Sequence, residues 1–266
     1  MLAGCAPVEN PEESARFDTL LAVEQVAGVL HATSGGIVLD ITATPPQIAT
    51  AAVAAVAVLD EREWPFDVTL VLYRPGVADS GTEFTFALDD PRERLQQRAE
   101  LWANLVTSGF ASVRMNLFGE GSEYGDGVIS VEGWAAQAAP PSTAEAYEGI
   151  LRALDGTGLE PSRMQVNVDL GFQLLNDDVS VPIADGLLDT VERLIAEWGF
   201  AYAAVQVEPE LTTITLARGH DGLAWVSFTP DEAAVVRAEL AGAGLLTPSL
   251  RVTGLGSEPV AIWEGA

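Results

Sequence analysis

Short stretches in which apolar and polar residues alternate recur along the chain, and longer stretches with apolar residues three or four positions apart separate them. The first pattern is typical of half-buried β-strands and the second of amphipathic helices. Between residues 36 and 118 the patterns predict a strand, a helix, two strands, a helix and a strand. We expect these elements at 36–43, 45–62, 67–74, 82–88, 90–108 and 111–118.

The same order of elements returns in the next part of the chain. We expect them at 127–135, 142–156, 162–170, 178–184, 185–199 and 200–208. The stretch GFASVRMNL at 109–117 also aligns with GFAYAAVQV at 199–207, which indicates an internal duplication. Because βαββαβ is the ferredoxin-like order, we predict an α+β fold of tandem ferredoxin-like repeats with antiparallel sheets and helices on one face. One continuous, mostly antiparallel sheet with helices on one face is the alternative.

Glycine and proline punctuate these elements in alternation. A glycine ends every second helical stretch, where a positive φ closes a helix at low cost. After each of the other helical stretches, a proline precedes the next strand, because proline ends a helix and favours an extended chain before it. The glycines are Gly28, Gly109 and Gly199, and the prolines are Pro65, Pro161 and Pro248.

Two pieces of the chain are left outside the two predicted repeats. The C-terminal part, 209–266, has the order βαββ, and the segment 17–34 has the order αβ. We therefore hypothesise that 17–34 completes the C-terminal unit. The predicted division is a flexible tether at 1–16, the αβ segment at 17–34, repeats at 35–118 and 119–208, and the βαββ unit at 209–266.

The charge of the chain restricts its partners. The net charge is −26, and every one of the 13 basic residues is an arginine. Since nucleic-acid binding depends on neutralising phosphates, this chain is not expected to bind nucleic acid. Cations or a basic protein face would be attracted to it. The longest apolar run, 48–59, is too short to cross a membrane and predicts a buried helix.

A search for catalytic and metal-binding patterns finds no complete set of residues. His31 and His220 have no further histidine at a metal-ligand spacing, and Ser122 does not lie in a Gly-x-Ser-x-Gly motif. The acidic loops 118–127 and 176–180 offer oxygen ligands for Ca²⁺, although neither has the spacing of an EF-hand. We predict no catalytic residue, no metal site and no cofactor.

The only cysteine of the chain, Cys5, follows Leu2, Ala3 and Gly4 and precedes a polar, proline-bearing stretch. The sequence LAGC resembles the lipobox of bacterial lipoproteins. The resemblance implies that Cys5 carries a lipid, that the chain is cut before it, and that the stretch APVENPEES acts as a tether. Acyl chains of this kind hold a protein at a membrane by burying their methylene groups.

These observations lead to two expectations about function. The first is a non-enzymatic, extracytoplasmic lipoprotein of the cell envelope, anchored to the cell membrane through Cys5 and acting as a binding or assembly module. Its partners would be the membrane and a basic protein, and edge strands and clefts between repeats would be its docking surfaces. The alternative is a soluble cytoplasmic α+β protein that binds a small molecule between repeats. Besides these two, a hydrolase that acts through carboxylates stays open, although no pair of acids stands out in the sequence. The sequence makes no prediction of oligomeric state.

Overall fold

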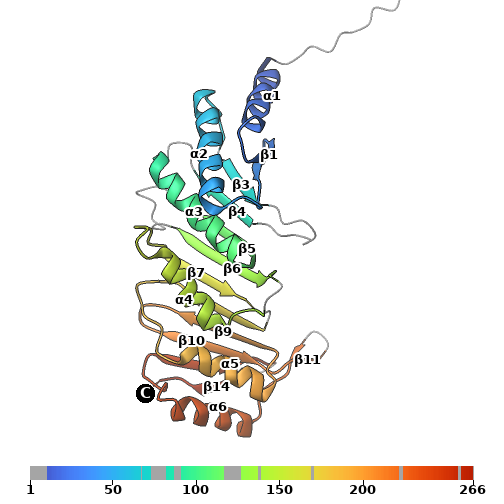
Figure 1. The fold of residues 1–266 in the computed structure, drawn as a ribbon. Helices are drawn as coiled ribbons and strands as arrows, with labels where there is room; N and C mark the ends of the chain where they lie inside the picture. The colour runs from blue at the N-terminus through green and yellow to red at the C-terminus, as the bar shows by residue number, and fades with distance from the viewer. Residues whose placement is uncertain are drawn as a thin grey trace, which may run out of the picture. The chain divides into compact units, whose positions relative to one another are not determined.

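The computed structural model describes residues 11–66, 68–72, 82–86, 91–116, 127–136, 139–168, 171–221, 224–256 and 259–265. Within these residues the protein is a mixed α/β protein with six helices (Figure 1). The chain divides into two compact units, Met1–Thr107 and Ser108–Ala266. None of the helices in the described part of the chain combines the length and the apolar character needed to cross a bilayer.

Unit 1 contains three helices and a four-stranded ladder. The helices are α1 (Pro11–Glu24), α2 (Pro45–Glu61) and α3 (Arg92–Ser108), whose last residue lies beyond the unit boundary, and the strands are β1 (Val29–Thr33), β2 (Gly36–Leu39), β3 (Val68–Leu72) and β4 (Thr82–Phe86). The strands lie side by side in sequence order. β1 and β2 are antiparallel, β2 and β3 parallel, and β3 and β4 antiparallel. The predicted buried helix is confirmed, because α2 buries seven residues between Ile48 and Leu59.

Unit 2 also consists of helices and a sheet, and its sheet has more strands. Its elements are β5 (Phe110–Asn116), β6 (Val128–Trp134), α4 (Thr143–Leu154), β7 (Arg163–Asn167), β8 (Phe172–Asn176), α5 (Leu187–Trp198), β9 (Tyr202–Val207), β10 (Thr212–Ala217), β11 (His220–Asp221), β12 (Ala224–Trp225), α6 (Pro230–Gly242), β13 (Leu250–Gly254) and β14 (Val260–Trp263). The sheet order is β5-β6-β7-β8-β9-β10-β13-β14, and β11 and β12 pair separately. The strand expected at 178–184 is wrong: β8 lies earlier, at Phe172–Asn176, and 177–186 is the loop that leads to α5.

The strand pairings of unit 2 correct the predicted ferredoxin-like arrangement. In a ferredoxin-like repeat a helix connects two parallel strands, and a further strand lies between these two in the sheet. Here β6 and β7 are direct parallel neighbours on either side of α4, with Ile129 opposite Met164. The pair β8 and β9 has the same relation across α5. Hairpin partners are antiparallel, so the sheet is mixed and the predicted antiparallel sheet is wrong.

The repeating element is therefore a helix followed by two strands. Counted from the helix, the described chain holds this αββ order six times, and the glycine and proline boundaries alternate between successive repeats. In this frame 17–34 supplies the helix and first strand of the first repeat, since β1 pairs with β2 and α1 contacts α2. The short hairpin β11–β12 lies between the fifth and the sixth repeat and is an addition to this order. The further proposal that 17–34 also completes the C-terminal unit stays a prediction.

Helices and sheet form two layers in unit 2. α4 contacts α5, and α5 contacts α6, so these helices share one face of the sheet (Figure 1). Buried residues alternate with half-buried ones along β7, β8 and β9. Met164, Leu174 and Val205 belong to the buried set, which makes up the core beneath the helices. The alternation follows from strand geometry, because successive side chains point to opposite faces.

The predicted conformations of three glycines are confirmed. Gly28, Gly109 and Gly199 have φ angles of 91°, 129° and 65°. Each glycine follows a helix of its repeat and turns the chain toward the next strand. The backbone there lies in the left-handed region, which L side chains rarely adopt.

Glu24 ties the end of α1 to β1 and makes the stability of this region depend on pH. Its Oε1 accepts a hydrogen bond from the Ala32 backbone N–H at 3.0 Å and contacts His31 Nδ1 at 2.6 Å. The Ala32 bond, followed by the His31 bond, lowers the pKa of Glu24 below its ordinary value of 4.5. The contribution of Glu24 to stability is therefore present above this value and is lost as the pH falls through the lower, folded-state pKa.

We expect Glu24→Gln to lower the melting temperature at about pH 7 and to have a vanishing effect below the folded-state pKa. Thermal unfolding followed by circular dichroism at both pH values measures the difference. Glu13→Gln removes the same charge from the exposed start of α1 and serves as the control. Equal shifts for the two variants at neutral pH would contradict the role given to Glu24.

Candidate functional site

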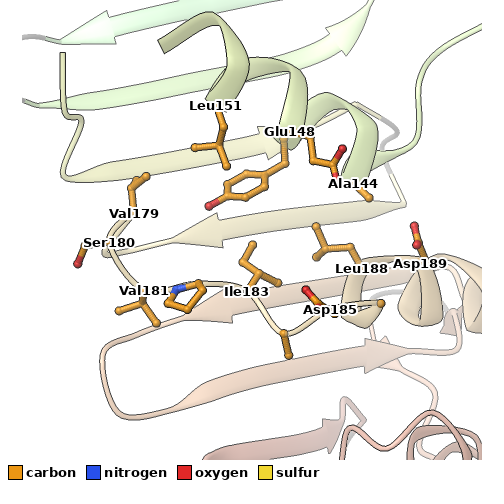
Figure 2. A pocket seen from close by; sticks show the side chains of 14 residues that line it. Ala144, Glu148, Leu151, Val179, Ser180, Val181, Ile183, Asp185, Leu188 and Asp189 are labelled. Carbon is orange, nitrogen blue, oxygen red and sulfur yellow. The ribbon is translucent and has the colours of Figure 1, made fainter. Parts of the chain in front are cut away.

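A hollow of about 450 Å³ lies on the helix side of unit 2, between α4, α5 and the loop 177–186 that joins β8 to α5 (Figure 2). Volumes of roughly 300–1,000 Å³ are usual for small-ligand sites. Leu151 from α4, Ile183 from the loop and Leu188 from α5 surround the centre of the hollow. It therefore lies between two successive αββ repeats.

Local capping fixes where α4 begins. Ser142 Oγ accepts a hydrogen bond from the Glu145 N–H, and a Glu145 oxygen accepts one from the Ser142 N–H, so the two residues form a capping box. The Thr143 N–H at the start of the helix donates to Glu192 Oε1 of α5 at 2.5 Å. This bond joins the two helices that form the walls of the hollow.

A buried polar pair supports the inner wall, which Tyr147 lines. Tyr147 is only 7% exposed and Asn176 is fully buried. Asn176 Nδ2 donates a hydrogen bond to the Tyr147 hydroxyl at 2.9 Å, and Asn176 Oδ1 accepts one from the Asp178 N–H at 3.1 Å. Burial raises the pKa of Tyr147 above its ordinary value of 10.0. The tyrosine is thus a neutral group that connects α4 to the end of β8 and to the start of the loop.

The loop is shaped by its own side chains. Asp178 Oδ1 accepts hydrogen bonds from the N–H and the hydroxyl of Ser180, at 3.0 and 2.6 Å. The Val181 N–H donates to the Asp178 carbonyl oxygen at 2.9 Å. Gly186 then adopts a left-handed conformation with a φ of 73°, and α5 begins at the next residue. The turn at 178–181 sets the course of the chain along the hollow.

The hollow has an apolar floor and an acidic rim. The apolar residues lining it include Tyr147, Leu151, Val179, Val181, Ile183 and Leu188. The ionisable side chains on the rim are the carboxylates of Glu148, Asp185 and Asp189. No arginine or histidine lines the described hollow. Glu148 has an exposed ion pair with Arg152 at 3.4 Å. Such a site favours a ligand with an apolar body and a positive charge.

Of the described residues singled out from sequence, those of the loop 176–180 border this hollow, through Val179 and Ser180, and the others lie elsewhere. Cys5 and most of the acidic loop 118–127 lie outside the described residues. His31 contacts Glu24 in unit 1, and His220 lies in β11. In the loop at 176–180, Asp177 contacts Arg163 and Gln206, and Asp178 binds Ser180. Groups of three or more metal-ligating side chains are absent from the described part of the chain.

Sequence reasoning overlooked the residues that build the hollow. Tyr147 and Asn176 are 29 positions apart, and Thr143 and Glu192 are 49 apart. The sequence offered two signals: the spacing of Ser142 and Glu145, which is typical of a capping box, and the acidic turn at 176–180. Each signal indicates one part of the site, but neither shows that the two parts lie side by side. Comparison of the chain with protein-family models, with curated proteins and with solved structures finds no match.

Proposed function

We propose that the protein is a non-catalytic binding module, built on αββ repeats and held at the outer face of the cytoplasmic membrane by a lipid on Cys5. The observation that carries the binding role is the hollow between α4 and α5, with its apolar floor and acidic rim. The lipobox-like sequence LAGC and the polar stretch after it support the anchor. The net charge of −26 favours a positively charged partner.

The chemistry of the lining supports binding in preference to catalysis. Nucleophilic catalysis needs a nucleophile within hydrogen-bond reach of a base that a third group orients. Ser180 is the one serine in the lining of the described hollow. Its hydroxyl donates a hydrogen bond to Asp178 Oδ1 within the turn. The Tyr147 hydroxyl accepts a hydrogen bond from an amide. These contacts shape the wall and the loop.

The anchor is tested with the native gene and its upstream region expressed in a related bacterium. We expect the protein in the membrane fraction, with an intact mass that begins at Cys5 and includes a diacylglyceryl group. Cys5→Ser should move it to the soluble fraction, because the sulfur that carries the acyl chains is missing. An unmodified, soluble wild-type protein would show the anchor proposal to be wrong. The proposed binding role of the hollow would not be affected by that result.

A second candidate function is the binding of a small molecule by a soluble protein. The volume of the hollow, about 450 Å³, favours it, since a single small ligand fits such a space. A thermal-shift screen of small amines tests whether the hollow binds such a ligand, and the location of the wild-type protein, measured as above, separates the two candidates. A ligand that raises the melting temperature of wild type and not of Leu188→Arg, which fills the hollow with a charge, would support this second function.

A further inference from the structure

We infer that the binding site is one extended groove along an end of the unit 2 sheet, and that it takes an extended basic peptide segment of a partner protein. This inference rests on the proposed binding role and specifies the partner.

Two further hollows adjoin the first. One of about 1050 Å³ lies between the end of α4 and the chain leading into β7, and it shares Leu151, Val179 and Ser180 with the first hollow. Another of about 250 Å³ lies beside the turn between β9 and β10, and it shares Val181, Pro182 and Ala184 with the first. Residues 179–184 therefore border all three hollows in turn.

The sheet register places the three hollows along a single line. Met164 at the start of β7 lies opposite Asn176 at the end of β8, which lies opposite Val207 at the end of β9. Val207 pairs with Thr212, and Thr212 with Leu250 at the start of β13. The row crosses four strand spacings of about 4.8 Å, or about 19 Å. An extended peptide of about six residues covers this length.

The charged side chains that line the three described hollows are all acidic, although Glu148 pairs with Arg152 outside the lining. Eight carboxylates line the three described hollows, and no arginine or histidine does. They are Glu148, Asp155, Glu160, Asp178, Asp185, Asp189, Glu208 and Glu210. Like charges at this density repel one another, and a chain that brings alternating positive charges relieves that repulsion.

Apolar side chains between the carboxylates define the rest of the ligand. Leu151 is 36% exposed although it borders two of the hollows. Val181 and Ile183 are half-buried in the loop and border the central hollow. Because side chains alternate along an extended chain, a peptide that alternates arginine with valine presents its apolar side to this floor and its charges to the rim.

The test uses a fluorescent synthetic peptide of about eight residues, alternating arginine and valine, and measures its anisotropy with the full chain. One carboxylate is neutralised in each hollow: Asp155→Asn, Asp189→Asn and Glu210→Gln. We expect each single variant to weaken binding and the triple variant to weaken it about tenfold. The control triple variant, Glu197→Gln, Asp231→Asn and Glu264→Gln, removes the same charge from residues outside the hollows and should change binding less than about twofold.

Three results would overturn the inference. Equal weakening by both triple variants would mean that the peptide responds to net charge alone. An effect of only one single variant would mean that the hollows do not act as one groove. The wild-type chain could fail to bind the peptide while a small amine still raises its melting temperature through the central hollow. That result would refute the peptide as the ligand and keep the binding role. Failure of both ligands would overturn the binding role as well.

Discussion

Trp102→Ala is expected to lower the free energy of unfolding of unit 1 by about 4 kcal/mol, because large-to-small substitutions of a buried tryptophan leave a cavity. Trp102 lies in α3 and has no exposed surface. Its ring lies 5.9 Å from that of Phe84 in β4, which is also fully buried. The indole therefore fills much of the space between this helix and the strand. Urea unfolding followed by far-ultraviolet circular dichroism measures the loss.

Trp198→Ala provides a control within the same protein. Trp198 is the last residue of α5 and is 48% exposed. Its removal should cost about 2 kcal/mol, clearly less than that of Trp102, since roughly half of its surface already lies in water. If the two tryptophan variants destabilise the protein equally, the cavity explanation for Trp102 is wrong.

The two tryptophans also show where sequence reasoning about the core fails. They occupy similar places in the second helix of each predicted repeat, which suggests the same role in core packing. Counted from the glycine that follows each helix, however, Trp102 is seven residues before Gly109 and Trp198 one residue before Gly199. A difference of six positions at 3.6 residues per turn rotates a side chain by about 240°, so the two residues lie on different helix faces.

Local patterns predicted the elements well because they reflect local physics. Alternation marked most of the strands, although the strand expected at 178–184 is a loop and β8 lies at 172–176 instead. Ser142 and Glu145, like Thr229 and Glu232, have the spacing of a capping box, and such boxes form at the starts of α4 and α6. Pairing is different, because the order βαββαβ is compatible with a helix that connects adjacent parallel strands or strands separated by a third. Nothing in the sequence around β6 or β7 states which strand lies beside it. The neighbouring strand is decided by packing between distant segments.

The candidate site was beyond local reasoning for the same reason. Its wall depends on a hydrogen bond between Tyr147 and Asn176, and its acidic line depends on strand register. In a chain with 39 acidic residues, the sequence does not distinguish the carboxylates of the site from the others. They become a candidate site only when the loops that carry them lie at one end of the sheet.

Gly109→Ala is expected to destabilise unit 2 by about 3 kcal/mol, and two separate costs contribute. The φ of Gly109 is 129°, where an L side chain is strained by roughly 1–3 kcal/mol. An added Cβ would also lie 2.7 Å from Cζ2 and Cη2 of Trp134. That indole cannot easily move aside, because it packs edge-on against Phe110 with ring centroids 5.5 Å apart. Forcing an extra carbon into a packed site costs about 1–3 kcal/mol more.

Gly199→Ala separates the two costs, because Gly199 is the aligned glycine 90 positions later in the chain. Its φ of 65° is also positive, but a Cβ added there would meet no described atom of another element within 4 Å. Only the backbone strain remains, so we expect a loss of about 1 kcal/mol. Urea midpoints of both variants, compared at equal slopes, give the two free energies. A loss at Gly109 no larger than that at Gly199 would mean that Trp134 yields, and that the contact between the β5 entry and β6 is looser than its geometry indicates.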